Sequence, residues 1–372
     1  MKSISINDEQ YMLRCLDLAN KGAGHVSPNP MVGAVIVKNG KIIGSGYHKE
    51  FGKPHAEVNA INSVKTSIKN ATLYVNLEPC CHYGKTPPCT DLIISSGISE
   101  VKIGMLDPNP LVSGKGILQL KKAGIKVSVG ILEEECKKLN EAFTKFIRTK
   151  IPFVTLKIAQ TMDGKIADTN KKSKWISNEQ SREFVHNLRA GTDAIIVGAE
   201  TINIDNPNLT THKLGKREPI RVVIDGNLNV KINSRIFAKN PNKNIIFVSD
   251  KSAAEKYKKY NILSSKGVNI IKIKTKKDNI IPIKNILEVL GSKGISSVLV
   301  EGGAFTFSEF IMSGEVDKVI VFIAPKIFGQ GISPFEYLNA SNICKNIKLK
   351  NITTRMLDGD ILIEAYIERN IQ

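Results

Sequence analysis

The chain has 372 residues and a formal net charge of +18, with 42% hydrophobic and 24% charged residues. That length favours two domains, since a single hydrophobic core usually stops growing by about 250 residues. The composition is that of a soluble globular protein, and it excludes a disordered chain, a collagen-like chain and a disulfide scaffold.

The amino-terminal part predicts an alternation of strands and helices. Two apolar runs flank Asn39-Gly40, a dipeptide typical of a two-residue hairpin turn because both central residues take positive φ. The expected elements, in chain order, are a hairpin (31–37 and 41–47), a helix (55–64), a strand (71–77), a helix (90–96), a strand (101–106), a helix (116–122), a strand (125–129) and a helix (133–148). Ile151-Pro152 then interrupts the pattern. We therefore place a domain boundary near Thr149, with domains at 1–149 and 150–372.

The second part restarts with a strand at 153–158 and repeats short β-rich runs, with helical patterns between them. These runs lie at 194–197, 220–224, 244–248, 298–300 and 319–324. Alternation of this kind predicts an α/β fold, with a mostly parallel sheet covered by helices in each half.

The distribution of charges and cysteines indicates where in the cell the protein lies and which partners it can have. The first residues carry charges from Asp8 to Asp17 where a signal peptide needs an unbroken apolar stretch, and no later run reaches the roughly 18 apolar residues of a membrane span. We expect a cytoplasmic protein without a membrane partner. Three of the six cysteines are Cys80, Cys81 and Cys89. They are too clustered for a disulfide framework, which favours a metal site or a reactive thiol.

The positive charge raises the question of a nucleic-acid partner. Much of the excess lies in scattered lysine runs, such as 256–259 and 272–277, among which few aromatic residues occur. Proteins that bind single strands need aromatic stacking platforms beside their basic residues. The runs are typical of a lysine-rich solvated surface, and we expect no nucleic-acid partner.

A metal-binding pattern occurs in the amino-terminal part. His55-Ala56-Glu57 opens a predicted helix, and Pro79-Cys80 follows a predicted strand, with Cys89 at the start of another helix. These are the parts of the zinc deaminase signature. Imidazole and thiolate are ligands that Zn²⁺ prefers, and three protein ligands leave a position for a water whose pKa falls to about 7. We expect His55, Cys80 and Cys89 to bind Zn²⁺ and Glu57 to be the catalytic general acid and base.

Alternatives stay open at this site. The signature usually has two residues between its cysteines, whereas eight separate Cys80 from Cys89, so a structural zinc ion is the competing interpretation. Cys81 competes with Cys80 as a ligand. The position directly after Pro79 favours Cys80.

The run Glu78-Pro-Cys-Cys-His-Tyr-Gly-Lys-Thr-Pro-Pro-Cys-Thr90, with His55-Ala-Glu57 and Pro28-Asn-Pro-Met-Val-Gly33, resembles the bifunctional riboflavin biosynthesis deaminase-reductases. The long loop between the cysteines belongs to that family's pattern. The resemblance implies a cytidine-deaminase-like α/β/α domain that deaminates 2,5-diamino-6-ribosylamino-4(3H)-pyrimidinone 5′-phosphate. It also implies a substrate pocket lined by Asn29, His48, His82 and Lys85.

The second part offers one phosphate-binding candidate from its own pattern. Glu301-Gly302-Gly303 lies between a predicted strand and a helix-like run. Two glycines at such a turn let backbone amides approach a phosphate, although a plain tight turn is an equal alternative. No G-x-G-x-x-G occurs, so a standard dinucleotide-binding fold has no support.

Four further stretches resemble the family's reductase motifs, in a domain similar to dihydrofolate reductase. They are Thr161-Met-Asp-Gly-Lys165, Ser173-Lys-Trp-Ile-Ser177, Arg189 and Asp205-Asn-Pro-Asn-Leu-Thr210. The resemblance implies NADPH-dependent reduction of the ribosyl side chain to ribityl. The NADPH contacts it implies are Ala159, Trp175, Thr201, Asp205 and Gly303. The reductase substrate contacts it implies are Ser173, Arg189, Leu209, His212 and Glu301.

Three of these residues have competing interpretations. Trp175 could pack in the core, and Arg189 could be a surface cation at a helix end. The family usually has Arg where this chain has His212, which puts one phosphate contact in doubt and leaves Arg217 as the alternative.

We therefore expect a two-domain enzyme of riboflavin synthesis that uses Zn²⁺ and NADPH and acts on a small phosphorylated pyrimidine. The sequence leaves open whether the chain forms a homo-oligomer. The competing hypotheses are a nucleoside or tRNA deaminase with an appended domain, and a basic RNA-binding protein whose zinc ion is structural.

Overall fold

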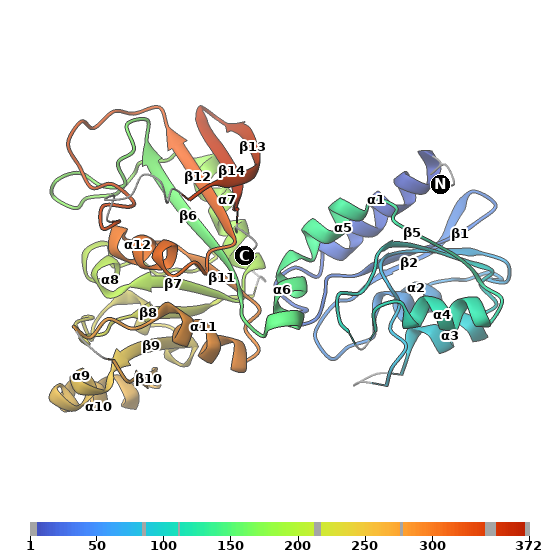
Figure 1. Cartoon of the computed structure of the whole chain (residues 1–372), viewed down its shortest axis with the longest axis horizontal. Helices are drawn as coiled ribbons and strands as arrows, with labels where there is room; N and C mark the ends of the chain where they lie inside the picture. The colour runs from blue at the N-terminus through green and yellow to red at the C-terminus, as the bar shows by residue number, and fades with distance from the viewer. Residues whose placement is uncertain are drawn as a thin grey trace. The chain divides into compact units, whose positions relative to one another are not determined.

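The chain divides into two compact units, Met1–Lys150 and Ile151–Gln372. The computed structural model describes residues 6–83, 87–110, 112–211, 217–275, 278–338 and 347–368. Each unit is built around its own β-sheet (Figure 1). In the described part of the chain, no helix is long and apolar enough to span a bilayer.

The first unit contains a five-stranded sheet in the order β2-β1-β3-β4-β5. Its strands are β1 (Gly33–Lys38), β2 (Lys41–Tyr47), β3 (Thr72–Leu77), β4 (Glu100–Met105) and β5 (Lys126–Val129). The predicted hairpin is present, since Asn39 and Gly40 both have positive φ and β1 pairs antiparallel with β2. β1 is also antiparallel to β3, and only the β3–β4 and β4–β5 pairings are parallel. This sheet is therefore mixed, whereas the sequence predicts a mostly parallel one.

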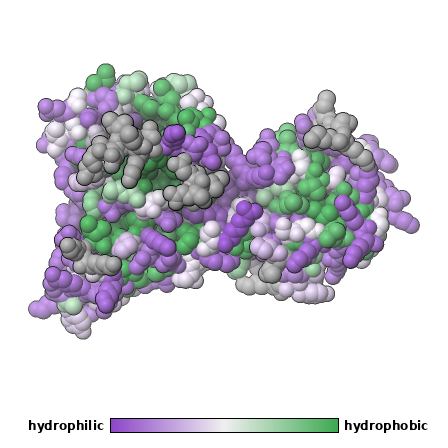
Figure 2. Space-filling model, viewed as in Figure 1, coloured by the Kyte–Doolittle hydropathy of each residue, from purple (hydrophilic) through white to green (hydrophobic). Residues whose placement is uncertain are grey.

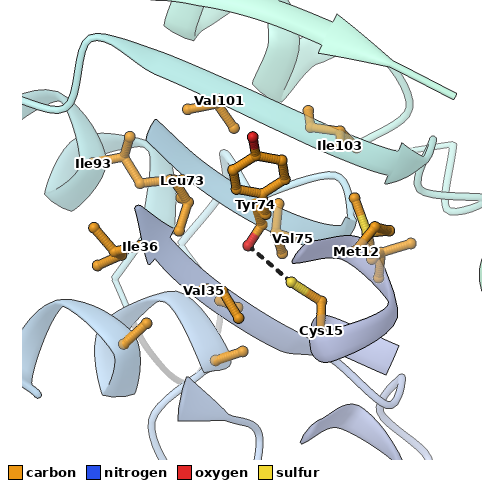
Figure 3. Packing of buried hydrophobic residues seen from close by; sticks show 14 of the residues in the cluster. Met12, Cys15, Val35, Ile36, Leu73, Tyr74, Val75, Ile93, Val101 and Ile103 are labelled. Carbon is orange, nitrogen blue, oxygen red and sulfur yellow. Dashed lines mark hydrogen bonds between the residues drawn. The ribbon is translucent and has the colours of Figure 1, made fainter. Parts of the chain in front are cut away.

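Helices cover both faces of this sheet (Figure 1). α1 (Ile6–Asn20) and α5 (Glu133–Leu139) lie on one face, and α2 (Ala56–Asn62), α3 (Cys89–Ser95) and α4 (Lys115–Lys122) lie on the other. Side chains of paired residues share a face of the sheet, as Ile36 does with Leu73. Figure 3 shows Ile93 of α3 beside Leu73, and Cys15 of α1 donating its thiol hydrogen bond to the Tyr74 carbonyl.

The prediction of a single helix over 133–148 is wrong. The structure has α5 and then α6 (Glu141–Thr149), separated at Asn140. The buried Asn140 side chain accepts a hydrogen bond from the Met31 N–H at 2.8 Å and donates one to the Met31 carbonyl at 3.0 Å. An asparagine that bonds to distant backbone is better placed at a helix break than within a helix, because its side chain competes with the helical backbone.

The second unit contains a nine-stranded sheet in the order β10-β9-β8-β7-β11-β6-β12-β14-β13. Its strands are β6 (Phe153–Thr161), β7 (Ala194–Gly198), β8 (Ile220–Ile224), β9 (Asn244–Ser249), β10 (Asn269–Ile273), β11 (Ser297–Val300), β12 (Lys318–Ala324), β13 (Leu349–Leu357) and β14 (Asp360–Ile367). The pairings from β10 across to β12 are parallel, and the β13–β14 hairpin adds to β12 antiparallel. The mostly parallel sheet predicted for this half is confirmed.

The strands at the centre of this sheet are buried on both faces. Along β7, Ala194 and Ile196 pack in one core and Ile195 and Val197 in the other. The first core includes α11 (Ile283–Ser292) and α12 (Ala304–Met312). The second includes α8 (Ala199–Asp205), α9 (Asp250–Glu255) and α10 (Tyr257–Ser265). α7 (Glu179–Gly191) contributes Val185 to a smaller cluster on β12 and β14. Two 3₁₀ turns, η1 (Arg235–Phe237) and η2 (Pro241–Lys243), complete the described elements. Such doubly covered parallel sheets bind ligands at the carboxyl ends of their strands.

Candidate active sites

Three side chains that could ligate a metal ion meet in the first unit, and we call them the metal-ligating group. His55 precedes α2, Cys80 follows β3, and Cys89 begins α3. The two sulfur atoms lie 3.5 Å and 3.4 Å from Nδ1 of His55, and the ligand atoms are all within 4.8 Å of one another. Among the residues that the structure describes, this is the only such group of His, Cys, Asp and Glu side chains, and Cys81 is outside it. Two thiols and an imidazole at this spacing fit a zinc ion.

The surroundings of these groups favour a thiolate. Hydrogen bonds from Cys89 and His55 lower the pKa of the Cys80 thiol to about 4, against the opposing effect of burial. The Cys89 N–H points at the Cys80 sulfur at 3.4 Å. A hydrogen bond to Cys80 raises the pKa of the His55 imidazole. The hydrogen bond to Cys80 and burial raise the pKa of the Cys89 thiol, so the ionised sulfur of this pair is that of Cys80. Metal ligation would require Cys89 to lose its proton as well.

Glu57 lies in the first turn of α2, two residues after His55. Its side chain is only 3% exposed. Burial raises the pKa of its carboxyl group to about 7, and the nearby Cys80 acts in the same direction. A carboxyl group that titrates near neutral pH can both accept and return a proton, which is what a general acid and base must do.

Asn29 and His48 form a fixed pair beside the metal-ligating group. The Asn29 amide nitrogen is 3.3 Å from Nε2 of His48, and Nδ1 of His48 is 3.2 Å from the Pro54 carbonyl. Because a carbonyl only accepts, Nδ1 carries the proton and Nε2 accepts from Asn29. Burial lowers the pKa of His48, which favours this neutral form. Its ring packs edge-on against His55, with centroids 5.4 Å apart.

The other two predicted substrate residues lie in the loop between the cysteines. His82 is exposed, and Lys85 lies outside the described residues. Asp107, a buried acid two residues after β4, is not predicted from the sequence. Burial raises the pKa of its carboxyl group to about 6, and Glu78 and Cys80 add to that effect. No pattern around Asp107 marks it, because its burial arises only in the folded chain.

A cavity of about 1330 Å³ opens in the second unit. Sites for one drug-sized ligand usually measure about 300–1,000 Å³, so this cavity has room for two ligands together. It is lined by every predicted reductase residue that the structure describes. These are Ala159, Ser173, Trp175, Arg189, Thr201, Asp205, Leu209, Glu301 and Gly303. His212 lies outside the described residues.

Arg189 and Glu301 form a two-pronged ion pair in this cavity. Nε and one terminal nitrogen of Arg189 each lie 2.7 Å from an oxygen of Glu301, and the other terminal nitrogen donates to the Thr210 carbonyl at 3.1 Å. The side chains are 14% and 7% exposed, so Arg189 is not the surface cation of the competing interpretation. The cation lowers the pKa of the Glu301 carboxyl group, although burial opposes it.

Thr201 and Asp205 lie on α8, directly after β7, and Gly303 follows the neighbouring strand β11. The Ser173 hydroxyl is 3.1 Å from the Asp205 carboxylate, at the end of α8. A Cβ atom at Gly303 would stand 3.3 Å from the Thr201 hydroxyl oxygen, so the backbone before α12 approaches α8 closely. Because Gly303 has no side chain, a ligand can come close to its backbone between the two helices.

Trp175 is 66% exposed and lines the cavity, so it does not pack in the core. The guanidinium of Arg182 lies 4.6 Å from its ring centroid. Lys157 of β6 also lines the cavity and is not predicted from the sequence. Burial lowers the pKa of its ammonium group, and Glu301 opposes that effect. A charged side chain in a strand whose other residues are all uncharged is the signal that could have identified it.

Both units match known families. Residues 5–105 match the cytidine and deoxycytidylate deaminase zinc-binding region, and residues 152–363 match the RibD C-terminal domain. The riboflavin biosynthesis protein RibD of Aquifex aeolicus is 43% identical over 96% of this chain and 97% of its own. That of Escherichia coli K12 is 37% identical, over 87% of this chain and 89% of its own.

Two solved structures match over nearly the whole chain. A diaminohydroxyphosphoribosylaminopyrimidine deaminase/5-amino-6-(5-phosphoribosylamino)uracil reductase from Thermotoga maritima is 42% identical, with a TM-score of 0.84, over 97% of this chain and 98% of its own. Acinetobacter baumannii RibD is 33% identical with a TM-score of 0.86, over 98% and 99%. A deaminase with an unrelated appended domain, or an RNA-binding protein, would not match over both units. The chain therefore belongs to the RibD family, whose members join a zinc-binding deaminase domain to a reductase domain in riboflavin biosynthesis.

Proposed function

We propose that the protein acts in the cytoplasm and that its amino-terminal domain, which we place at residues 1–149, deaminates 2,5-diamino-6-ribosylamino-4(3H)-pyrimidinone 5′-phosphate. The second domain, which we place at residues 150–372, then reduces the ribosyl side chain to ribityl with NADPH. The observation that carries the proposal is the convergence of two thiols and an imidazole beside a buried carboxyl group. The large cavity around the Arg189–Glu301 pair supports the second activity.

In the deaminase, His55, Cys80 and Cys89 would hold the zinc ion. A zinc ion bound there supplies Lewis acidity, which lowers the pKa of a coordinated water. Glu57 would accept a proton from the attacking water and deliver it to the ring nitrogen, and would then carry a second proton, from the hydroxyl group added at the reacting carbon, to the departing amine. The carbon keeps the oxygen, and the C–N bond breaks as ammonia leaves. The elevated pKa of Glu57 matches this exchange at neutral pH.

Asn29 and His48 would position the pyrimidine beside that carboxyl group. Their mutual hydrogen bond and the Pro54 contact fix the His48 ring before substrate binds. His82 and Lys85 come from the intervening loop, and we assign them to the substrate. Lys85 suits the phosphate, because an ammonium group is a compact point charge.

In the reductase, Arg189 keeps donors free for substrate. Its guanidinium has five N–H groups. Among the described residues, Glu301 and Thr210 accept three of these N–H groups, and the other two would serve the phosphorylated substrate. Glu301 thus fixes the guanidinium plane, and we assign Ser173, Leu209 and His212 to the same substrate.

The cofactor side of the cavity would use Ala159, Trp175, Thr201, Asp205 and Gly303. NADPH supplies the hydride and carries the reactivity of this step. The backbone amides before α12 can receive a phosphate group because the Gly303 position has no side chain. Trp175 presents an exposed ring to the cavity.

Supplying each substrate separately tests both activities. The diaminopyrimidine phosphate should release ammonia without NADPH, and the deaminated product should oxidise NADPH without releasing ammonia. Failure of either reaction in the zinc-loaded chain contradicts the activity proposed for that unit.

A further inference from the structure

Glu78 is a buried carboxylate that the proposed reaction does not use. Figure 2 shows hydrophilic side chains over much of the visible surface of the first unit, whereas Glu78 is only 3% exposed. It lies directly after β3, two residues before Cys80, and it is outside the metal-ligating group. A carboxylate is seldom buried without partners, because its removal from water is costly. The partners of Glu78 therefore indicate what it does.

These partners are backbone N–H groups of a later segment. Oε2 of Glu78 accepts hydrogen bonds from the Gly114 N–H at 2.9 Å and the Asp107 N–H at 3.2 Å, and Oε1 accepts one from the Ile117 N–H at 3.3 Å. Gly114 is the N-cap residue of α4 and has no side chain that could cap the helix. The first N–H groups of a helix lack partners within it and carry a partial positive charge. Glu78 thus caps α4 from another element.

The start of α4 also packs directly on the backbone that precedes Cys80. A Cβ atom at Gly116 would stand 2.3 Å from the Pro79 carbonyl oxygen and 3.2 Å from Oε1 of Glu78. A side chain cannot come that close to a backbone oxygen, so this contact requires glycine. The hydrogen bonds of Glu78 and the close approach at Gly116 are two separate features that hold α4 against this part of the chain.

The second cysteine of the metal-ligating group is tied to the same place. α3 begins at Cys89 and lies beside α4 (Figure 1). The Thr90 N–H of α3 donates a hydrogen bond to the Cys80 carbonyl at 3.2 Å. Cys80 is therefore held by α3 at its own carbonyl and by α4 through the two residues before it. Because Cys89 belongs to α3, these contacts set the spacing between the two thiols.

We propose that Glu78 is a positioning residue for the metal-ligating group. It docks α4 on the Glu78–Pro79 peptide and thereby keeps Cys80 at the distance from Cys89 and His55 that a zinc ion requires. This inference rests on the proposed deaminase function, in which those three side chains hold the zinc ion. Groups that orient a metal ligand from outside typically contribute a factor of about 10–100 to metal affinity. Glu78 acts through Cys80 and neither binds the metal nor carries a proton.

Competition between the whole chain and a chelator for Zn²⁺ tests this role without an activity assay. Glu78→Gln keeps the size of the side chain but replaces one acceptor oxygen with an NH₂ group, which cannot accept a backbone N–H. It should weaken zinc binding by about 10–100-fold. Gly116→Ala should also weaken it, because the added Cβ atom would push α4 away from Pro79. In the Co²⁺-substituted chain, both variants should shift the d–d bands, which depend on the geometry of the ligands.

Asp8→Asn is the matched control. Asp8 accepts hydrogen bonds from the Tyr74 hydroxyl at 2.7 Å and the Lys102 ammonium at 2.6 Å, and it lies on α1, on the opposite face of the sheet from α4. Its substitution should lower the thermal stability of the chain and leave zinc affinity and the Co²⁺ bands unchanged. A Glu78→Gln variant that behaves in the same way would show a purely structural role and overturn the proposal.

Gly116→Ala decides the matter if Glu78→Gln does not fold. Wild-type zinc affinity and unshifted Co²⁺ bands in a folded Gly116→Ala variant would overturn the proposal, because the docking of α4 would then have no effect on the metal site. The proposed function fails separately. A wild-type chain that binds zinc but releases no ammonia from the diaminopyrimidine phosphate overturns that function alone, since zinc affinity is measured without substrate.

Discussion

The Glu57 carboxyl group lies beside the metal-ligating side chains without belonging to them. We predict that Glu57→Gln retains zinc and loses deaminase turnover by a factor of about 10²–10⁴, because the amide cannot carry the proton. Metal analysis and ammonia release measure the two effects. Reduction of the deaminated substrate by the same variant is the control and should be unchanged. Loss of zinc from the variant would show that Glu57 is a ligand or a support for one.

The adjacent cysteines offer a matched pair of substitutions. Cys80 lies within the metal-ligating group and Cys81 outside it. We predict that Cys80→Ser and Cys89→Ser each weaken zinc binding strongly, because a hydroxyl is a much poorer zinc ligand than a thiolate. Cys81→Ser should bind zinc as the wild type does. Equal zinc loss from Cys81→Ser in a competition titration with a chelator would reverse the choice of ligand.

The Arg189–Glu301 pair links stability to pH. The folded pKa of Glu301 is lowered by Arg189, so its contribution to stability is present above the unfolded pKa of about 4.3 and is lost as the pH falls through the folded pKa. We predict that Glu301→Gln lowers the unfolding free energy by about 3 kcal/mol at pH 7, since it leaves a largely buried cation unpaired. The difference between variant and wild type should shrink below about pH 4.

Urea unfolding followed by the fluorescence of Trp175, the only tryptophan, measures this difference in the second unit. Glu288→Gln, at an exposed position on α11, should stay within about 0.5 kcal/mol of the wild type. A constant difference between Glu301→Gln and wild type from pH 7 down to pH 3 would contradict the ionic origin of the effect.

The sequence predicts side chains that belong to a spaced pattern and misses those whose chemistry arises from burial. His55, Cys80 and Cys89 are placed by the signature, and the structure brings them together. Lys157 and Asp107 have no such spacing. Their shifted pKa values come from the surrounding fold.

Asn140, at the break between α5 and α6, connects these helices to a loop that is distant in sequence. Asn140 at the break bonds to both backbone groups of Met31, close in sequence to Asn29. We predict that Asn140→Ala destabilises the first unit by about 2 kcal/mol, because it removes the acceptor of the Met31 N–H and one of the two amide donors to the Met31 carbonyl, the other being Asn76. It should also raise the deaminase KM more than it lowers kcat, since the loop that carries Asn29 is released.

Thermal unfolding and separate assays of the two reactions measure these effects. The exposed Asn62 at the end of α2 provides the control, because Asn62→Ala removes the same group at the surface. An Asn140→Ala variant with unchanged stability and KM would show that the break has no role in holding the loop.

Local turn chemistry predicts elements better than amphipathic spacing does. The Asn39-Gly40 hairpin is present because its positive φ values are a local requirement. The single helix over 133–148 fails because the Asn140 contact with Met31 is not local. β13 and β14 were also missed. β13 lacks the apolar run that marks the central strands, because a largely exposed strand does not need one.

At the scale of the whole molecule, each unit has its own sheet and its own candidate site. The metal-ligating group belongs to the first unit and the large cavity to the second. The two reactions should therefore depend on different residues and different cofactors, although one chain carries both.

The most direct test is the ratio of ammonia released to NADPH oxidised when the zinc-loaded chain acts on the diaminopyrimidine phosphate. Deamination followed by reduction predicts one molecule of ammonia released for each NADPH oxidised, with ammonia appearing first. A chelator should stop both signals from this substrate but leave NADPH oxidation intact when the deaminated compound is supplied. Oxidation of NADPH from the diaminopyrimidine phosphate without release of ammonia would contradict the account.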